Sequence, residues 1–274
     1  MNASEEDIGG LRLLLRIREQ YQDMRKRIDN RLGKKADGED QDVDERPVEP
    51  GAAKAAEELA DNAREQEAIV EKALKKALKR WPVYTEYLKG VKGVGPIMAA
   101  TIIASIDIEK ATTVSKIWQF AGMNPGQVRG LKREDHDDGT FDLIPTDTMV
   151  RGDRKAKGFV CPYNAKLKTA LLGVLADGFI KAQAPYCMDY YYPRKTQLEN
   201  SDRPVLERCG NGKEKTVAWK DATPMHRHMA ARRYMVKMFL IDLHKVWREI
   251  EGLAVRPPYS VEKLGHVHGG ASVA

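Results

Sequence analysis

The amino-acid sequence predicts a mainly α-helical protein with an N-terminal coiled-coil arm, a helical domain and at most small β-hairpins. Apolar residues recur at spacings of three and four over several long stretches, which is typical of amphipathic helices. Alternating strand patterns are scarce, and glycine or proline stands at the ends of the helical stretches. The chain has 274 residues, 42% of them hydrophobic, and is therefore long enough to form a substantial core.

Residues 1–35 predict a basic amphipathic helix, and Gly33 stands where the end of such a helix is expected. Its narrow apolar seam consists of Leu11, Leu14, Ile17, Tyr21, Met24 and Ile28. Residues 36–51 are rich in acidic residues, proline and glycine, and predict a solvated linker. Residues 52–89 predict a long coiled-coil-like helix that leads into the core and breaks at Pro82. The two helices form an arm that is a candidate for homodimerisation.

Residues 82–259 predict the helical domain. Its helices are expected at 96–105, 116–121, 165–182 and 224–250, with one small β-hairpin around 141–144 and loops elsewhere, including the stretch through 212. The apolar stripe of the last helix predicts burial of Met225, Met229, Val236, Phe239, Leu240, Leu243 and Trp247. The tyrosines of residues 186–192 predict a turn in which they either pack in the core or stack on bases. Residues 260–274 predict a flexible tail.

A glycine-rich stretch, GVKGVGPIMAA at residues 90–100, joins two predicted helices. Gly93 and Gly95 allow positive φ angles and let another backbone come close, and Pro96 suits the first position of the next helix. The unpaired N–H groups at that helix start would bind an anion. Residues 88–105 therefore resemble the helix-hairpin-helix motif, which grips the sugar-phosphate backbone. The alternative is a helical corner that only packs. On the binding interpretation, bulky residues at Gly93 and Gly95 weaken binding while the fold largely survives.

Basic residues gather near this stretch, after it and on the last helix. The net charge of +6 and the pI near 9.0 favour a polyanionic partner, either DNA, branched DNA included, or structured RNA. The candidate nucleic-acid-binding residues are Lys89, Lys92, Gly93, Val94, Gly95, Arg129, Lys132, Arg133, Arg151, Arg154, Lys155, Lys157, Arg233 and Lys237.

The order of the segments resembles the C-terminal portion of the insertion-sequence one-ten/one-sixteen transposase family. The resemblance rests on IMAATIIASIDI from Ile97, SKIWQFAGMNPG from Ser115, HRHMAARRYMVKMFLIDLHKVWRE from His226, and RPPY from Arg256. It spans roughly residues 52–259. It implies a helical DNA-binding domain whose serine attacks DNA, an N-terminal RuvC-like nuclease domain with an acidic metal site, and a structured guide RNA.

Two of these implied features have no counterpart in the sequence. About fifty residues precede the long helix, and they contain no strand with an embedded aspartate to build the metal site. No serine occurs between Ser115 and Ser201, where the nucleophile is expected. We therefore expect a nucleic-acid-binding protein that is not catalytic alone. The alternatives are a recombinase subunit whose nuclease half acts in trans, with a threonine or Cys161 replacing the serine, and a structural or assembly protein.

The remaining composition indicates a cytoplasmic protein without cofactors. The three cysteines form no CxxC pair, and neither a signal peptide nor a run of apolar residues long enough to span a membrane is present. The acidic residues at 134–139 lack the spacing of a metal site. Cys161, Cys209, His226 and His228 match no zinc-ligand pattern, so no metal is expected.

Overall fold

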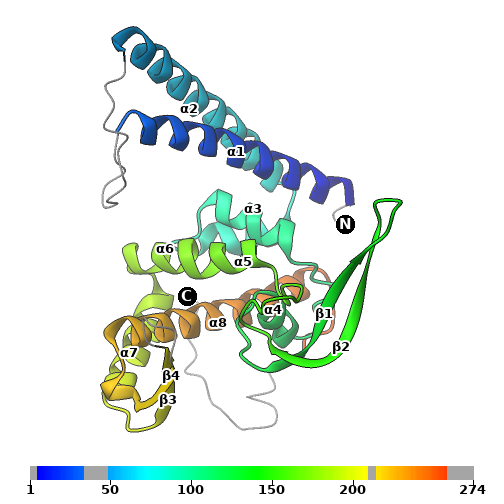
Figure 1. Ribbon diagram of the computed structural model, residues 1–274, viewed down its shortest axis with the longest axis vertical. Coiled ribbons are helices and arrows are strands. Elements are labelled where there is room, and N and C mark those ends of the chain that lie inside the picture. Colours follow the sequence, from blue (N-terminus) through cyan, green and yellow to red (C-terminus); the bar gives the residue numbers. More distant parts are fainter. Residues whose placement is uncertain (1–4, 34–48, 209–213, 258–274) are drawn as a thin grey trace.

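The computed structural model describes residues 5–33, 49–208 and 214–257 (Figure 1). Most of the predicted linker, the predicted tail and Cys209 lie outside the described residues. Helices dominate the described part, and its strands form two small antiparallel sheets, so the predicted fold class is confirmed. None of the helices described there is long and apolar enough to cross a membrane.

The N-terminal arm consists of α1 (Glu5–Arg31) and α2 (Pro50–Leu78), which lie side by side and run in opposite directions (Figure 1). Gly33 adopts a φ of +68° just after α1, as expected of the residue that ends a helix. α2 begins two residues before the predicted position because the Glu49 carboxylate accepts hydrogen bonds from the first backbone N–H groups of the helix.

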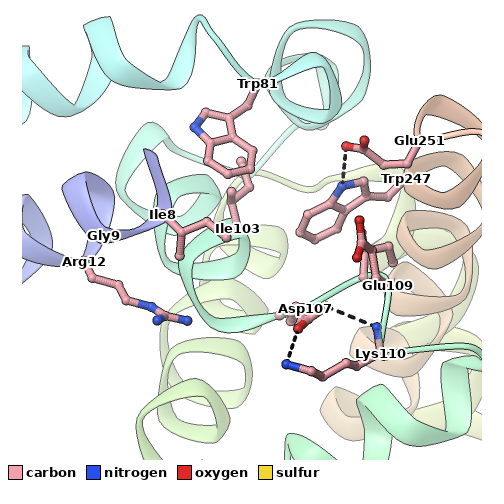
Figure 2. Close-up of a pocket in the computed structure, with 12 residues that line it drawn as sticks. Ile8, Gly9, Arg12, Trp81, Ile103, Asp107, Glu109, Lys110, Trp247 and Glu251 are labelled. Carbon is pink, nitrogen blue, oxygen red and sulfur yellow. Dashed lines mark hydrogen bonds and ion pairs between the residues drawn. The ribbon is translucent and has the colours of Figure 1, made fainter. Parts of the chain in front are cut away.

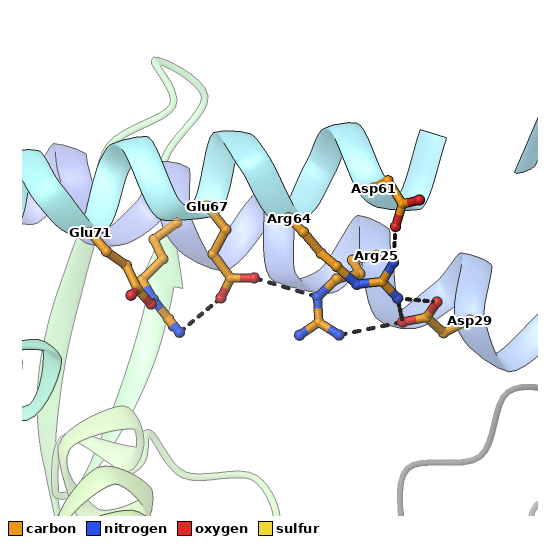
Figure 3. Close-up of polar contacts among 7 residues, drawn as sticks. Arg25, Asp29, Asp61, Arg64, Glu67 and Glu71 are labelled. Carbon is orange, nitrogen blue, oxygen red and sulfur yellow. Dashed lines mark hydrogen bonds and ion pairs between the residues drawn. The ribbon is translucent and has the colours of Figure 1, made fainter. Parts of the chain in front are cut away.

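Ion pairs join the two helices of the arm (Figure 3). Arg18 and Arg25 of α1 contact the two carboxylate oxygens of Glu67 on α2, at 2.8 and 3.4 Å. Nearer the tip, Asp29 of α1 accepts two hydrogen bonds from Arg64 of α2, at 2.8 and 2.9 Å. The acidic residues of α2 thus engage part of the positive charge that the sequence places on the first helix.

The arm connects to the domain through a π-helical turn (Val83–Tyr87) and a 3₁₀ turn (Leu88–Gly90). The next helix is α3 (Pro96–Ser105), in which Pro96 occupies the first position, as predicted. Ala99 and Ala100 of α3 are fully buried, and their small side chains let this helix pack closely against its neighbours.

The domain surrounds a central helical segment made of α5, a π-helical stretch (Ala170–Leu175) and α6. α3 lies on one side of this segment and α8 on the other (Figure 1). The other helices of the domain are, in chain order, α4 (Val114–Phe120), α5 (Ala165–Thr169), α6 (Ala176–Lys181), α7 (Tyr192–Glu199) and α8 (Pro224–Ile250). The helices expected at 165–182 and 224–250 are both present.

Aromatic side chains fill the middle of the core. The ring of Phe179 stacks on Tyr186 at a centroid distance of 5.3 Å and meets Phe239 edge-on at 5.4 Å. Tyr190 and Tyr191 are buried as well, so for these tyrosines and Tyr186 the structure supports core packing, whereas Tyr192 is 42% exposed. The segment is helical rather than a turn, with a π-helical stretch (Cys187–Tyr191) before α7.

The predicted burial of Met225 is wrong. Its side chain is exposed because it lies in the first turn of α8, where the helix extends past the core. Met229, one turn further on, is partly buried.

The two sheets are both hairpins. β1 (Gln127–Asp135) pairs with β2 (Phe141–Arg151), which makes the predicted hairpin considerably longer than expected. This long hairpin, hereafter the ribbon, projects from the end of the domain beside α4 (Figure 1). β3 (Pro204–Arg208) pairs with β4 (Glu214–Ala218), where the sequence predicted a loop. That prediction is wrong because each strand has only five residues, too few for an alternating pattern to be recognised.

Candidate nucleic-acid interface

The glycine turn, residues 90–96, meets a backbone of this same chain. Gly93 has a φ of +95°, as predicted, and lies against Gly178 and Phe179 of α6. A Cβ atom on Gly93 would lie 2.7 Å from the Phe179 ring, which is closer than packed atoms allow. The predicted close approach of a backbone is therefore real, but the partner is α6. This contact argues against the expectation that the fold largely survives a bulky residue at Gly93.

Gly95 differs from the prediction in the other direction. Its φ is −82°, in the extended region that any residue adopts, so Gly95 does not use the positive φ that glycine allows. Gly95 is exposed, and a Cβ placed on it would meet no atom within 4 Å. It is the N-cap of α3, and no side chain caps this helix start. Lys89 and Lys92 are exposed beside it, and Val94 is half-buried. The start of α3 thus retains the geometry of an anion site.

A second group of cations lies around the loop that follows β2. Arg151 donates two hydrogen bonds to the buried carboxylate of Asp153, at 2.9 and 3.1 Å. The Nζ atom of Lys168 on α5 donates to the backbone carbonyl of Asp153 at 2.5 Å. Arg154 pairs with Glu214 at 2.9 Å. The loop is fixed at its start because the Gly152 N–H donates to the carbonyl of Gly126 at 2.8 Å.

α8 contributes two further cations to the same place. Burial lowers the pKa of Arg233, which also senses the charges of Asp153, Arg151 and Arg154. One turn further, Lys237 lies 4.7 Å from the centre of the Trp118 ring, and its pKa is lowered first by burial and then by Arg233. A lowered pKa means that the positive charge is poorly stabilised where it stands. An anion bound at this place would stabilise both charges.

We call Arg151, Arg154, Lys168, Arg233 and Lys237 the basic cluster. Within the described residues, the carboxylates that lie against it are those of Asp153 and Glu214, so positive charge is in excess. Sequence analysis missed Lys168. The one sequence feature that could have indicated Lys168 is its position four residues after Asn164. Asn164 caps α5 and places the start of this helix near the loop.

Arg151, at the end of β2, is the ribbon's contribution to the basic cluster, and the predicted cations of β1 are not part of it. Arg133 pairs with Asp135 at 2.6 Å and lies over the Phe141 ring at 4.1 Å, so its positive charge is largely compensated by partners within the ribbon. Arg129 and Lys132 are exposed along β1. Lys155 and Lys157 are exposed in the loop after β2.

The glycine turn and the basic cluster lie at the two ends of the central helical segment. Gly178 touches the turn and Lys168 belongs to the cluster, and ten residues separate them along the helix. At 1.5 Å per residue this separation is roughly 15 Å. The structure therefore places part of the predicted residues in two separate groups, the glycine turn and the basic cluster, and the others along β1 and in the loop after β2.

The hydroxyl and thiol groups considered as nucleophiles are dispersed. Thr146 bonds to the carbonyl of Gly130 within the ribbon, and Thr140 bonds to Asp138 at its tip. Cys161 is the nearest to the basic cluster, with its Sγ atom 3.3 Å from the carbonyl oxygen of Tyr163. Among the residues described, no three His, Cys, Asp or Glu side chains are grouped so as to hold a metal ion.

A separate hollow of about 500 Å³ lies where the arm meets the domain (Figure 2). Trp81 and Trp247 form its apolar walls, and Arg12 donates to the carbonyl of Ala104 at 2.9 Å. Acidic and basic side chains alternate around it, and Asp107 pairs with Lys110 at 2.8 Å. Because these charges largely balance, this hollow lacks the cationic excess of the basic cluster.

These features define a mainly α-helical protein that carries a group of cations around Asp153 and an exposed, uncapped helix start at Gly95. Residues 85–134 match the model of the transposase IS116/IS110/IS902 family. The predicted resemblance to this transposase family is thus confirmed over a segment that contains the glycine turn, α3, α4 and most of β1. The wider resemblance over 52–259 stays a prediction. Neither the curated proteins nor the solved structures contain a match to the chain.

Proposed function

We propose that this transposase-family protein binds the phosphate backbone of DNA through the basic cluster, with the start of α3 as a second contact. The observation that carries the proposal is the pair of half-buried cations on α8, Arg233 and Lys237, whose pKa values are lowered by burial without a matching carboxylate for each. Phosphate oxygens supply the missing negative charge. The family match supports a nucleic acid as the source of that phosphate, because transposases act on DNA.

Two candidate phosphate sites near the two ends of the central helical segment favour binding without base readout. The cluster offers guanidinium and ammonium groups, and the start of α3 offers backbone N–H groups. Both kinds of donor contact phosphate and carry no sequence information. The proposed interaction is therefore sensitive to salt and to the shape of the nucleic acid, and insensitive to its sequence.

Fluorescence anisotropy of labelled duplex DNA, branched DNA and structured RNA tests the cluster. Each phosphate contact contributes about 0.9 to the slope of log K against log salt on duplex DNA. Arg233→Gln and Lys237→Gln should each reduce that slope by the amount expected for about one phosphate contact, whatever the sequence of the DNA. Lys76→Gln, an exposed cation on α2, is the control and should leave the slope unchanged. An unchanged slope in both cluster variants contradicts the proposal.

The second site has a test that preserves the fold. Aspartate is a favourable N-cap residue, and Gly95 has the backbone conformation and the space for a side chain. Gly95→Asp should keep or raise the melting temperature while its carboxylate repels phosphate and weakens DNA binding. Gly95→Ser caps the helix without charge and should bind more tightly than Gly95→Asp. Equal affinities of the two variants would exclude the start of α3 as a phosphate site.

The proposal includes binding and no strand cleavage by this chain alone. A strand-transfer assay with supercoiled DNA and divalent metal checks this part. Covalent protein–DNA adducts would contradict it, and their loss in Cys161→Ala would identify the attacking thiol.

A further inference from the structure

The outer half of the ribbon exposes the apolar side chains of Phe141 and Leu143 on one face, although the Arg133 guanidinium lies over part of the Phe141 ring. Directly paired residues of antiparallel strands share a face, so Leu143, opposite Arg133, and Phe141, opposite Asp135, lie on one side. Phe141 is 48% exposed and Leu143 is 46% exposed. A two-stranded hairpin is marginally stable in water by itself. Exposed apolar residues on such an element are typical of a surface that docks against another protein.

The charge of this half of the ribbon argues against nucleic acid as its partner. The nine-residue stretch 134–142 around the tip contains five carboxylates: Glu134, Asp135, Asp137, Asp138 and Asp142. Arg133 is already paired with Asp135, and His136 contacts Asp142 at 3.1 Å. The tip is therefore negative and would repel phosphate. Its partner is expected to combine apolar and basic residues.

The outer side of α1 has this combination. One stripe of this helix contains Leu13, Met24, Arg27 and Arg31. These residues lie on the same side because the spacings between successive members, eleven, three and four residues, are helical spacings. Leu13 is 58% exposed and Met24 is 41% exposed, and both arginines are exposed. α2 covers the opposite side of α1, where Leu11 is buried and the ion pairs of Figure 3 lie.

We propose that the ribbon of one copy of this chain docks on the outer stripe of α1 of a second copy. Phe141 and Leu143 then pack on Leu13 and Met24, and the acidic tip faces the two arginines of the stripe. A second copy is the partner because one chain carries both complementary surfaces. Reciprocal docking in a two-fold dimer buries the ribbon and the stripe of both copies. The proposal is independent of nucleic-acid binding.

Sedimentation velocity of the full chain over a range of concentrations, without nucleic acid, tests the apolar contact. The parent chain should be dimeric, and Phe141→Ser with Leu143→Ser should raise the dissociation constant at least tenfold. Both residues are exposed, so the variant is expected to fold, and circular dichroism verifies this. Val174→Ser, which changes another exposed apolar residue (63% exposed), is the control and should leave the dimer unchanged. A monomeric parent chain, or a ribbon variant that dimerises as the parent does, overturns the proposal.

Charge reversal tests the pairing of the two surfaces. Glu134→Lys with Asp137→Lys reverses the tip, and Arg27→Glu with Arg31→Glu reverses the stripe. Each double variant alone should dissociate at least tenfold more readily than the parent, and a mixture of the two should form a heterodimer through the pair of reversed surfaces. If the stripe variant loses the dimer while the tip variant keeps it, α1 pairs with something other than the ribbon, and the proposal fails.

Discussion

Gly93 and Gly178 lie back to back, so that a Cβ atom on Gly178 would come within 2.8 Å of the carbonyl oxygen of Gly93. The contact joins the glycine turn to α6 and leaves no room for a side chain on either residue. A turn that the sequence marks as open to a ligand is thus closed on one side by the protein itself. Its other side, at Gly95, remains exposed.

Alanine at either of these two glycines should therefore destabilise the fold. Gly93→Ala places a Cβ at a positive φ and against Phe179, and Gly178→Ala pushes the turn away from α6. We expect each to lower the free energy of unfolding by about 1–3 kcal/mol, measured by urea denaturation. Gly95→Ala is the matched control, with a permitted φ and free space, and should stay within about 1 kcal/mol of the parent. Equal stability of all three variants contradicts the Gly93–Gly178 contact.

Local patterns in the sequence were sufficient to predict the long helices. α8 extends from Pro224 to Ile250, as its apolar periodicity and its proline at the first position predict. Short strands such as β3 are not predicted, because an alternating pattern cannot be recognised in five residues. The segment that packs against Gly93 is α6, more than eighty residues away in the sequence, so local patterns do not reveal it either. Sequence spacing specifies that a glycine needs room, and only the tertiary structure specifies what fills it.

The basic cluster likewise combines residues that local sequence patterns predict with contacts that only the tertiary structure shows. Arg151 and Arg154 stand near each other in the sequence, and Arg233 was recognised from its position on the polar side of a helix. Their convergence around Asp153 depends on α8 crossing the loop after β2, which no local pattern contains. Lys168 was missed for this reason, since by itself it is one lysine among several on a helix.

The arm should depend on Glu67. Its buried carboxylate receives Arg18 and Arg25, and neutralising it removes one of the two carboxylates that each arginine contacts, since Arg18 also pairs with Glu71 and Arg25 with Asp29. Glu67→Gln should lower the free energy of unfolding by about 1.5–3 kcal/mol, the range for hydrogen bonds to charged groups. Asp61→Asn, at an exposed pair with Arg64, should change stability by less than about 1 kcal/mol. Comparable losses in the two variants would show that the interhelical network adds little to the arm.

His244 should make the protein less stable in mild acid. Its ring is buried, lies 2.9 Å from the carbonyl oxygen of Ala111, and has a pKa lowered by burial. In the unfolded chain the imidazole takes up a proton near its ordinary pKa of about 6.5, whereas the folded chain resists it. Stability is therefore fully present above about pH 6.5 and falls as the pH drops through the lower, folded-state pKa, by at most about 1.4 kcal/mol per pH unit for one group.

Urea denaturation at a series of pH values between 7 and 5 checks this expectation. His244→Gln keeps an N–H donor for Ala111 and should flatten the profile, even if its absolute stability is lower. His228, whose pKa is also lowered mainly by burial, contributes with the same sign, so the double variant with His228→Gln should be flatter still. A profile of unchanged slope in the double variant would exclude both histidines as its source.

Asp153 distinguishes a structural role of the basic cluster from a binding role. Asp153→Asn removes the carboxylate that pairs with Arg151 and leaves the neighbouring cations with less compensation. The free energy of unfolding should fall by about 1–3 kcal/mol. DNA should bind more tightly, because a negative charge that repels phosphate is lost. Bound DNA should accordingly raise the melting temperature of the variant by more than that of the parent. The exposed Asp202→Asn, away from the cluster, is the control and should alter neither property. If Asp153→Asn lowers both stability and affinity, the cluster serves to hold the fold, and DNA is bound elsewhere.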